Sequence, residues 1–438
     1  MEPTLTLEPR LQRLSRLDPV RVTGRVAQVV GLVVEATGLS APVGELCEIH
    51  SSRTQPPARA EVVGFREDRT LLMPLGDLRG VAPGGEVVRT RLPLSVAVGP
   101  GLLGRVVDGL GAPLDDGEPL PPGEPRPLYA APPHPLKRAR VLSPLATGVR
   151  AVDGFLTVGY GQRMGIFSGS GVGKSLLLGM MARGTAADVA VIALIGERGR
   201  EVRDFLERDL GREGLRRSVV ITSTSERPAL VRVKAALLAA TVAEHFRDQG
   251  AHVLLLMDSL TRVAMAQREV GLATGEPPTA RGYTPSVFAL LPQLLERSGC
   301  AARGSVTGIY TVLVEQDDMN DPIADAARSV LDGHVVLTRR LASANHYPAV
   351  DVLESVSRVM HDVADPEHRA WAAAGRRHLA VYRDSEDLVQ IGAYVKGSNA
   401  DIDAALEHRP RLQRFLQQAP DELTGFQDTR AQLCAAVA

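Results

Sequence analysis

Cysteine, aromatic residues, excess charge and long apolar runs are all scarce in this chain of 438 residues. Its 3 cysteines are scattered and show neither metal-ligand spacing nor an even disulfide framework, which favours a reducing compartment. Lys and Arg number 50 against 51 Asp and Glu, so no net field attracts nucleic acid or acidic lipid. The sequence has no N-terminal apolar signal and no run of about 18 apolar residues, so we expect neither signal-peptide secretion nor a membrane span.

The composition that remains is that of a globular protein, with 44% hydrophobic and 23% charged residues. The length exceeds what one ordinary core accommodates, so two or three domains are expected. In residues 1–18, leucines recur at helical spacing with arginines between them. This segment predicts a short helix that either packs on its own domain or docks on a partner.

Residues 19–98 carry short β segments separated by Gly, Pro and Asp, which predicts a small β-barrel. Residues 26–34, 61–65 and 86–88 are examples. A barrel that binds single-stranded nucleic acid needs stacking aromatics and a positive groove. Between residues 20 and 98, Phe65 is the only aromatic residue, and nine Arg are balanced by eight Asp or Glu. A structural or oligomer-packing role is therefore favoured.

Residues 99–360 begin with a Pro-rich connection, residues 113–135, that we expect to be extended and on the surface. Apolar strands then alternate with helical stretches, which predicts a parallel sheet with helices on both faces. The expected strands include residues 189–195, 218–222, 253–257 and 308–314. Residues 361–438 form a predicted helical domain, with helices at 361–383, 387–395, 402–408 and 411–418.

The run SGSGVGKS, residues 168–175, lies between an apolar strand and a helical stretch. Such a loop turns backbone N–H groups toward phosphate oxygens, backed by the positive end of the helix. We therefore predict a nucleoside triphosphate site. Lys174 would reach the β- and γ-phosphates and the Ser175 hydroxyl would sit on Mg²⁺. The other residues of the predicted loop are Gly169, Ser170, Gly171, Val172 and Gly173.

Two further carboxylates stand at the ends of predicted strands. Asp258 ends a buried apolar run, where it would hold Mg²⁺ directly or through water, or cap the next helix. Glu197 follows another apolar strand and is the candidate for orienting the water that attacks the γ-phosphate. Glu201, one helical turn on, is an alternative, and Arg198 would bind either Glu197 or the phosphates.

Two candidates come from later in the chain. Arg358 could supply the cation that a developing γ-phosphate charge needs, in the site of a neighbouring subunit. Tyr347 could place its ring against adenine, although an isolated tyrosine more often has only a packing role.

Taken together, several segments resemble the ATPases of type III protein export, flagellar and injectisome, which are related to rotary ATP synthase catalytic subunits. The resemblance covers residues 20–420. The segments that carry it are the loop at 168–175, ALIGERGREV (193–202), LLLMDSLTRVAMAQREVGLATGEPP (254–278), RGYTPSVFALLPQLLERSG (281–299), DDMNDPIADAARSVLDGH (317–334) and YPAVDVLESVSRVM (347–360).

The resemblance implies an N-terminal β-barrel, a RecA-like α/β nucleotide domain and a C-terminal helical domain, assembled as a homohexamer that hydrolyses ATP with Mg²⁺. By position, Lys174, Ser175, Glu197 and Asp258 match the family's phosphate, magnesium, catalytic and strand-end residues. Arg358 matches the arginine that reaches the neighbour, and Tyr347 the residue beside adenine. Ser168 and Gln316 depart from the family pattern, and Gln316 puts the local loop conformation in doubt.

The implied setting is the cytoplasmic face of an inner-membrane export apparatus. The implied partners are a stator-like regulatory protein bound through residues 1–18, a central stalk-like protein, and export chaperones with their substrates. Residues 390–398 look more flagellar than injectisome. The alternatives are a rotary ATP synthase subunit, an RNA-dependent ring translocase, and a nucleotide-binding module without turnover.

Overall fold

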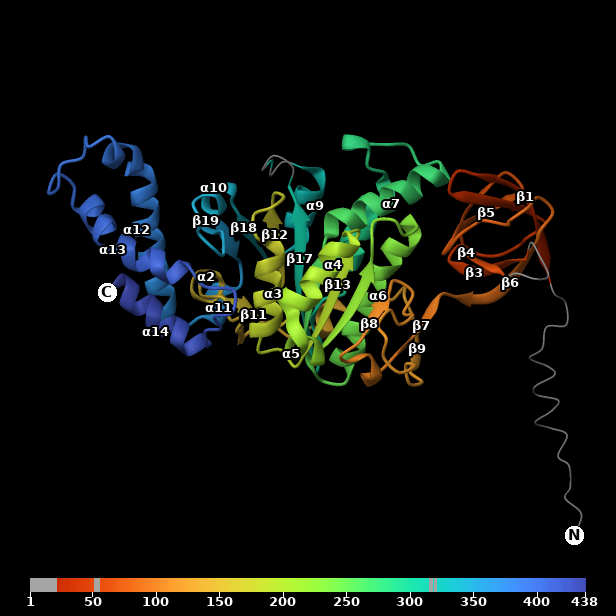
Figure 1. Cartoon of the computed structure of the whole chain (residues 1–438), viewed down its shortest axis with the longest axis horizontal. Coiled ribbons are helices and arrows are strands. Elements are labelled where there is room, and N and C mark those ends of the chain that lie inside the picture. Colours follow the sequence, from red (N-terminus) through yellow and green to blue (C-terminus); the bar gives the residue numbers. More distant parts are fainter. Residues whose placement is uncertain (1–21, 51–55, 315–317, 319–320) are drawn as a thin grey trace, which may run out of the picture. The chain divides into compact units, whose positions relative to one another are not determined.

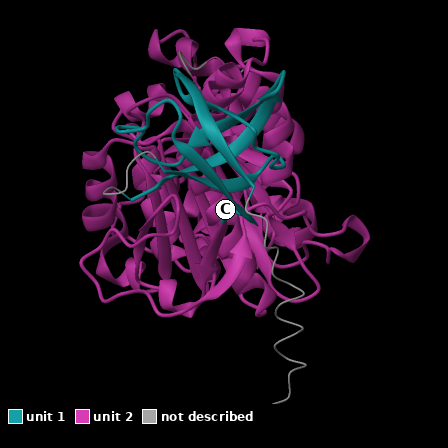
Figure 2. Ribbon diagram, turned by 90° about the vertical axis from the view of Figure 1, so that its right-hand side faces the viewer, with its two compact units in different colours: residues 1–94 teal, residues 95–438 magenta. Residues whose placement is uncertain are grey.

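The computed structural model describes residues 22–50, 56–314, 318 and 321–438 (Figure 1). The segment 1–18 that predicts a docking helix, and Gln316 with Asp317, lie outside the described residues. The chain divides into two compact units, residues 1–94 and 95–438, coloured teal and magenta in Figure 2.

The first unit contains a closed barrel, as the sequence predicted. Alternating residues of its strands bury an apolar core that includes Val34, Cys47 and Leu72. Residues 26–34 form a hairpin that turns at Gly31 rather than one continuous segment, because Gly31 takes a left-handed φ of 56°. In the described part of this unit the barrel order is β1 (Thr23–Val30), β2 (Val33–Thr37), β5 (Arg69–Pro74), β4 (Ala58–Arg66), β3 (Glu45–His50) and β6 (Glu86–Pro93).

The second unit is built on a mostly parallel sheet. Central strands such as β13 are buried along their whole length, as parallel strands covered on both faces are. β19 runs antiparallel at one edge, and β16 (Gly299–Cys300) pairs antiparallel with β17. The strand order is β19 (Val350–Ser357), β18 (Gly333–Leu337), β12 (Arg163–Ser168), β17 (Ser305–Leu313), β15 (His252–Asp258), β13 (Val189–Ile195), β14 (Ser218–Ser223) and β8 (Val106–Asp108).

Two small sheets complete the strands of this unit. β7 (Ser95–Val98) pairs with β9 (Glu124–Pro127), so the Pro-rich connection contains an edge strand that the sequence did not predict. Proline is tolerated there because an edge strand leaves some N–H positions unpaired. β10 (Pro144–Leu145) pairs with β11 (Val158–Gly159).

Helices cover both faces of the main sheet. α6 is the most enclosed: it is buried from Ala229 to Val231 and from Val233 to Arg247, and it packs against β13 and β15. α3 lies within the cluster formed by β12, β13 and β15. The helices of this part of the chain are α2 (Arg150–Phe155), α3 (Lys174–Gly184), α4 (Gly199–Asp204), α5 (Gly211–Arg216), α6 (Ala229–Asp248), α7 (Leu260–Thr274), α8 (Pro285–Leu295), α9 (Pro322–Val330) and α10 (Arg339–Ser343), with a π-helical stretch Phe205–Leu210 between α4 and α5.

Of the helices that follow in the described chain, the first packs against β11, and the others pack against α2 and against one another. They are α11 (Met360–Val363), α12 (Pro366–Gln390), α13 (Ala400–Leu416) and α14 (Phe426–Val437). Three predictions here were wrong in detail. Pro366 begins a separate helix behind the N-cap Asp365, so the expected helix 361–383 is divided.

The expected separate helix 387–395 is also wrong: residues 387–390 are the last turn of α12, and the helix ends before Ile391 and Val395, which are 75% and 69% exposed and have no core to pack on. The expected break at Pro410 is also absent. Pro410 lies inside α13, whose buried Leu412 and Phe415 join the main core beyond the proline.

Candidate active site

The carboxyl ends of β12, β13, β15 and β17 meet at one edge of the sheet. Ser168 pairs with Leu313, Met257 with Tyr310, and Leu194 with Asp258, so the segments that follow these strands emerge together. This edge is where ligands bind in open parallel sheets. The predicted phosphate loop and both predicted carboxylates lie here.

The loop leads from β12 directly into α3. Gly171 and Gly173 take left-handed φ angles of 76° and 91°, and Gly173 is the N-cap of the helix. Lys174 and Ser175 therefore occupy the first turn, where backbone N–H groups have no acceptor within the helix. Ser175 is exposed, whereas Ser168 is buried and its hydroxyl has no hydrogen-bond partner among the residues described.

The Lys174 ammonium contacts both carboxylates. Nζ donates to Oδ1 of Asp258 at 2.5 Å and lies 3.6 Å from Oε1 of Glu197. The three side chains are only 12%, 5% and 16% exposed, respectively. Asp258 also accepts a hydrogen bond from the hydroxyl of Thr311 on the neighbouring strand, at 2.7 Å. A positive charge is thus held between two carboxylates at the mouth of the loop.

Glu197 is the most perturbed carboxyl group of this site. Burial raises its pKa to about 7, with a smaller contribution from the charge of Asp258, against the opposing effect of Lys174. Its hydrogen bond to Glu201 lowers the pKa of Glu201. Glu197 therefore holds its proton more tightly than an ordinary glutamate and lies where it can exchange that proton near neutral pH.

Arg198 lies outside this group. Its side chain is 83% exposed, and within the described residues its ion pair is with Glu201, at 3.8 Å. Gly196, with a φ of 72°, lies instead against the side chain of Arg262 on α7. Nε of Arg262 is buried and has no hydrogen-bond partner in the described residues, which makes it an available donor for an anion.

Tyr347 lies beside the loop. A Cβ placed on Gly173 would come within 3.1 Å of the Cε1 atom of the Tyr347 ring, so the ring packs on the glycine. The carbonyl oxygen of Tyr347 accepts a hydrogen bond from the backbone N–H of Gln418 at 2.9 Å. The C-terminal helices thereby hold the segment that carries this ring.

Arg358 is not part of this cluster. It follows β19, and its backbone N–H donates to the carbonyl of Asp332 at 2.9 Å, next to Arg163 at the amino end of β12. The loop begins at the opposite end of that strand, about 16 Å away at about 3.3 Å per residue. Arg358 is exposed, and its guanidinium makes no hydrogen bond or ion pair with the residues described.

Sequence analysis missed Thr311 and Arg262. Thr311 is 53 residues from Asp258 along the chain, and only strand pairing brings them together. Arg262 is four residues beyond Asp258 on α7, which places it one turn into the helix. A search for cations one turn after a strand-end carboxylate could have found it.

A cavity of about 490 Å³ borders the loop. Gly169 and Ser170 line it together with residues that are rich in arginine: Arg262, Arg268, Arg281 and Arg339. Arg281 is paired with Asp318 at 2.6 Å and Asp321 at 3.0 Å. Such a lining suits an anionic ligand.

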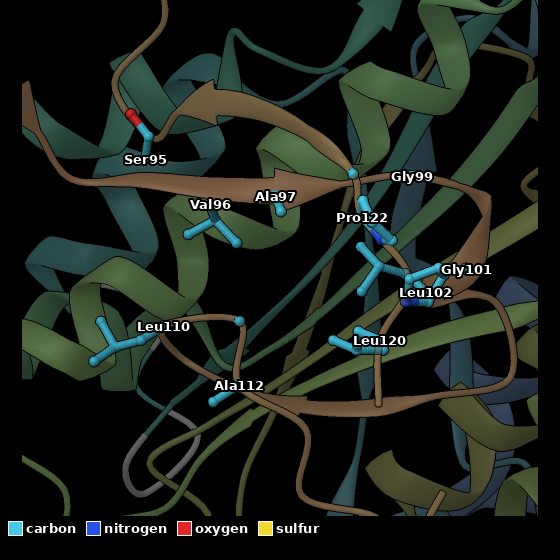
Figure 3. A pocket seen from close by; sticks show the side chains of 13 residues that line it. Ser95, Val96, Ala97, Gly99, Gly101, Leu102, Leu110, Ala112, Leu120 and Pro122 are labelled. Carbon is cyan, nitrogen blue, oxygen red and sulfur yellow. The ribbon is translucent and has the colours of Figure 1, made fainter. Parts of the chain in front are cut away.

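A second cavity of about 400 Å³ lies between β7 and the Pro-rich connection (Figure 3). Its lining is small and apolar, with Val96, Leu102 and Leu120 among the side chains, and contains no titratable group. It offers no chemistry for phosphate transfer.

Sequence profiles of known families match three parts of the chain. The beta-barrel domain of the ATP synthase alpha/beta family matches residues 26–91, and the nucleotide-binding domain of that family matches residues 148–357. The C-terminal domain of the type III secretion ATPase EscN matches residues 364–435. This last match is to a type III secretion ATPase domain rather than to an ATP synthase domain.

Whole-chain relatives are similar to the chain along nearly its full length. The flagellum-specific ATP synthase of Bacillus subtilis is 52% identical over 95% of both chains, and the type 3 secretion system ATPase of Xanthomonas euvesicatoria is 50% identical over 97% of both. Flagellar and injectisome relatives are thus about equally similar to it.

Solved structures agree with this match. The assembled ATPase EscN of the enteropathogenic Escherichia coli type III secretion system superposes with a TM-score of 0.90, at 46% identity over 95% of this chain and 100% of that chain. EscN in complex with its central stalk EscO gives a TM-score of 0.88 at 45% identity.

No described helix is both long and apolar enough to cross a membrane. The barrel, the phosphate loop with its carboxylates and these matches together establish that the chain belongs to the family of flagellar and type III secretion ATPases and is a nucleotide-binding ATP hydrolase.

Proposed function

We propose that the chain hydrolyses Mg·ATP at the loop of residues 169–175, in a ring of six copies that drives protein export. The contact of Lys174 with both Asp258 and Glu197 carries the proposal. In the nucleotide-free site the carboxylates neutralise the ammonium. A triphosphate would take over Lys174, together with the unpaired N–H groups of the first turn of α3.

The residues present fit a magnesium ion. Mg²⁺ prefers hard oxygen ligands and typically uses one or two protein oxygens with phosphates and waters. Asp258 and the exposed Ser175 hydroxyl supply such oxygens at the mouth of the loop. Bound there, the ion would neutralise charge on the β- and γ-phosphates. Thr311 would hold the Asp258 carboxylate in place through its hydrogen bond.

Glu197 is the proposed water-orienting group. With its pKa near 7, a fraction of the carboxyl is ionised at neutral pH and can accept a hydrogen bond from the attacking water. Glu201 is ionised more readily and would position Glu197 through their shared hydrogen bond. Arg262, with its unpartnered Nε beside Gly196, is placed to donate to an anion here. Arg198 is proposed only as an exposed partner of Glu201.

Arg358 is proposed to act in the site of a neighbouring copy. Its backbone lies at the amino end of β12 and its own loop lies at the carboxyl end, farther apart than an arginine side chain reaches. An exposed arginine without a local partner is suited to neutralise phosphate charge across a subunit boundary. The relative EscN is described as assembled, which supports a ring for this chain.

The adenine is proposed to lie against Tyr347, whose ring packs on Gly173 at the end of the loop. Within the chain we propose a docking segment at residues 1–18, a barrel at 19–98, an ATPase domain at 99–360 and a helical domain at 361–438.

The proposed partners are a central stalk-like protein, by similarity to EscN with EscO, a stator-like regulator at residues 1–18, and chaperones with their export substrates. The proposed location is the cytoplasmic side of an inner-membrane export gate, with no nucleic acid involved. Residues 390–398 favour a flagellar export gate over an injectisome.

A phosphate-release assay tests the activity. Glu197→Gln keeps the size of the side chain and removes its charge, so Mg·ATP binding should persist while release falls by about a thousandfold or more. Lys174→Ala should instead weaken binding itself. If Glu197→Gln released phosphate at the wild-type rate, the assignment of Glu197 would be wrong.

A further inference from the structure

We propose that Asp332, Gln162 and Ser357 are positioning residues that fix the backbone of Arg358 for insertion into the neighbouring copy's site. The inference rests on the proposed function of Arg358 and deepens it. None of the three residues lies at the phosphate edge of the sheet.

Asp332 is bound to the amino end of β12 by both its main chain and its carboxylate. Its Oδ2 accepts from the backbone N–H and from Nε of Arg163, and its Oδ1 accepts from Nη2, each at 3.0 Å. Its backbone N–H donates to the carbonyl of Arg163 at 2.8 Å. A bidentate pair of this kind fixes geometry as well as charge. The carbonyl of Asp332 then receives the N–H of Arg358.

Gln162 joins the same carbonyl to the residue before Arg358. Its side chain is fully buried, and Nε2 donates to the carbonyl of Asp332 at 3.2 Å and to Oγ of Ser357 at 3.0 Å. The Ser357 hydroxyl in turn donates to the carbonyl of Thr157 at 3.0 Å. Residues 357 and 358 are therefore each tied by hydrogen bonds to the start of β12.

At this junction β18 and β19 are in close contact. Gly333 pairs with Ser357, and a Cβ at Gly333 would lie 2.5 Å from the carbonyl oxygen of Val356 and 2.7 Å from Sδ of Met164. Only glycine allows the two strands to approach so closely. The backbone that carries Arg358 is rigid, while its side chain is exposed and unpaired in the described structure. A group fixed in this way loses little freedom when it meets a ligand presented by another copy.

The first experiment compares matched variants of the full chain. Asp332→Asn is paired with Asp115→Asn, because Asp115 makes a similar bidentate pair with Arg105 at 3.0 and 2.5 Å, remote from Arg358. Ser357→Ala is paired with Ser355→Ala, because Ser355 is buried on the same strand and bonds to Asp351 and Val336 instead. We expect Asp332→Asn and Ser357→Ala to lower kcat about ten- to a hundredfold with ATP affinity unchanged. Asp115→Asn and Ser355→Ala should leave kcat within about twofold of wild type.

The second experiment tests whether each variant loses ATPase activity in its own site or in the site of the neighbouring copy. Each variant is mixed with Lys174→Ala chains, which carry an intact Arg358 but a defective loop. At a mixed boundary the intact loop of the Asp332→Asn chain receives the arginine of the Lys174→Ala chain. Phosphate release by the mixture should then exceed the sum of the two separate proteins. A defect of folding or of the chain's own site would not be repaired in this way.

Arg358→Ala is the reference. Alone it should lose about a thousandfold in kcat, and mixing with Lys174→Ala should restore activity. If Arg358→Ala is not restored, the proposed role of Arg358 in a neighbour is wrong. The positioning role alone is overturned by either of two results, given that mixing restores the activity of Arg358→Ala. In the first, Asp332→Asn and Ser357→Ala have the same kcat as their control variants. In the second, they lose activity that mixing with Lys174→Ala does not restore.

Discussion

The protonation of Glu197 should set the pH dependence of the reaction, because burial keeps its carboxyl protonated up to a pH at which other glutamates are ionised. The ionised form is the one that can orient a nucleophilic water. We therefore expect kcat/KM for Mg·ATP to rise with pH through an apparent pKa of about 7. The Glu197→Gln chain should lack this step in its residual activity. A profile that stays flat from about pH 6 to about pH 9 would contradict the assignment.

The same shift predicts a change in stability. Between pH 4.5 and about 7 the folded carboxyl keeps a proton that the unfolded chain has lost, so stability falls as pH rises through this window. Glu197→Gln removes this cost, and its amide can still donate to Glu201. Without nucleotide, the free energy of unfolding of the variant should exceed that of wild type by up to about 3 kcal/mol at about pH 8, so the variant should melt at a higher temperature there. At about pH 4 the variant and wild type should melt at the same temperature. Melting curves at the two pH values measure the difference, and a less stable variant at the higher pH would refute it.

The loop motif and the strand-end position are what made Lys174, Asp258 and Glu197 predictable. Both signals are local, and the sheet then brings the three side chains into contact. Thr311 carries no local signal because its role depends on the pairing of β15 with β17. The packing of Tyr347 on Gly173 depends on residues 174 positions apart, which no spacing rule contains.

Among the elements, the loop between β12 and α3 has the strictest backbone requirement. Gly171 and Gly173 both need a left-handed conformation, which costs an alanine about 1 to 2 kcal/mol. A Cβ at Gly171 meets nothing within 4 Å, whereas one at Gly173 meets the Tyr347 ring at 3.1 Å. Gly173→Ala should therefore lose more thermal stability and more nucleotide affinity than Gly171→Ala. Equal losses, measured by melting and by nucleotide titration, would show that the ring contact has no effect.

The elements also show where sequence patterns mislead. The strand predicted at 189–195 coincides with β13, because a fully buried parallel strand is a continuous apolar run. Around Pro410 a local rule was overridden: Ala405 before the proline and Leu412 after it are both buried, so tertiary packing holds α13 together. β8 was missed because Val106–Asp108 is too short to form a pattern and owes its place to β14.

For the molecule as a whole, the loop and Arg358 lie at opposite ends of β12. Under the proposed role of Arg358, one chain would contribute to two different sites and each complete site would need two copies. Specific ATPase activity should rise with protein concentration and level off once oligomers dominate. Serial dilution, with size-exclusion chromatography at the same concentrations, measures both quantities. A monomer with full activity would contradict the shared site.

The most direct measurement is calorimetric titration of the full-length chain with magnesium and a non-hydrolysable ATP analogue. We expect a saturable heat with one site per chain, and its loss in Lys174→Ala. The absence of any heat of binding in the wild-type chain would contradict the assignment of residues 169–175 as a triphosphate site, and with it every role proposed for the residues around them.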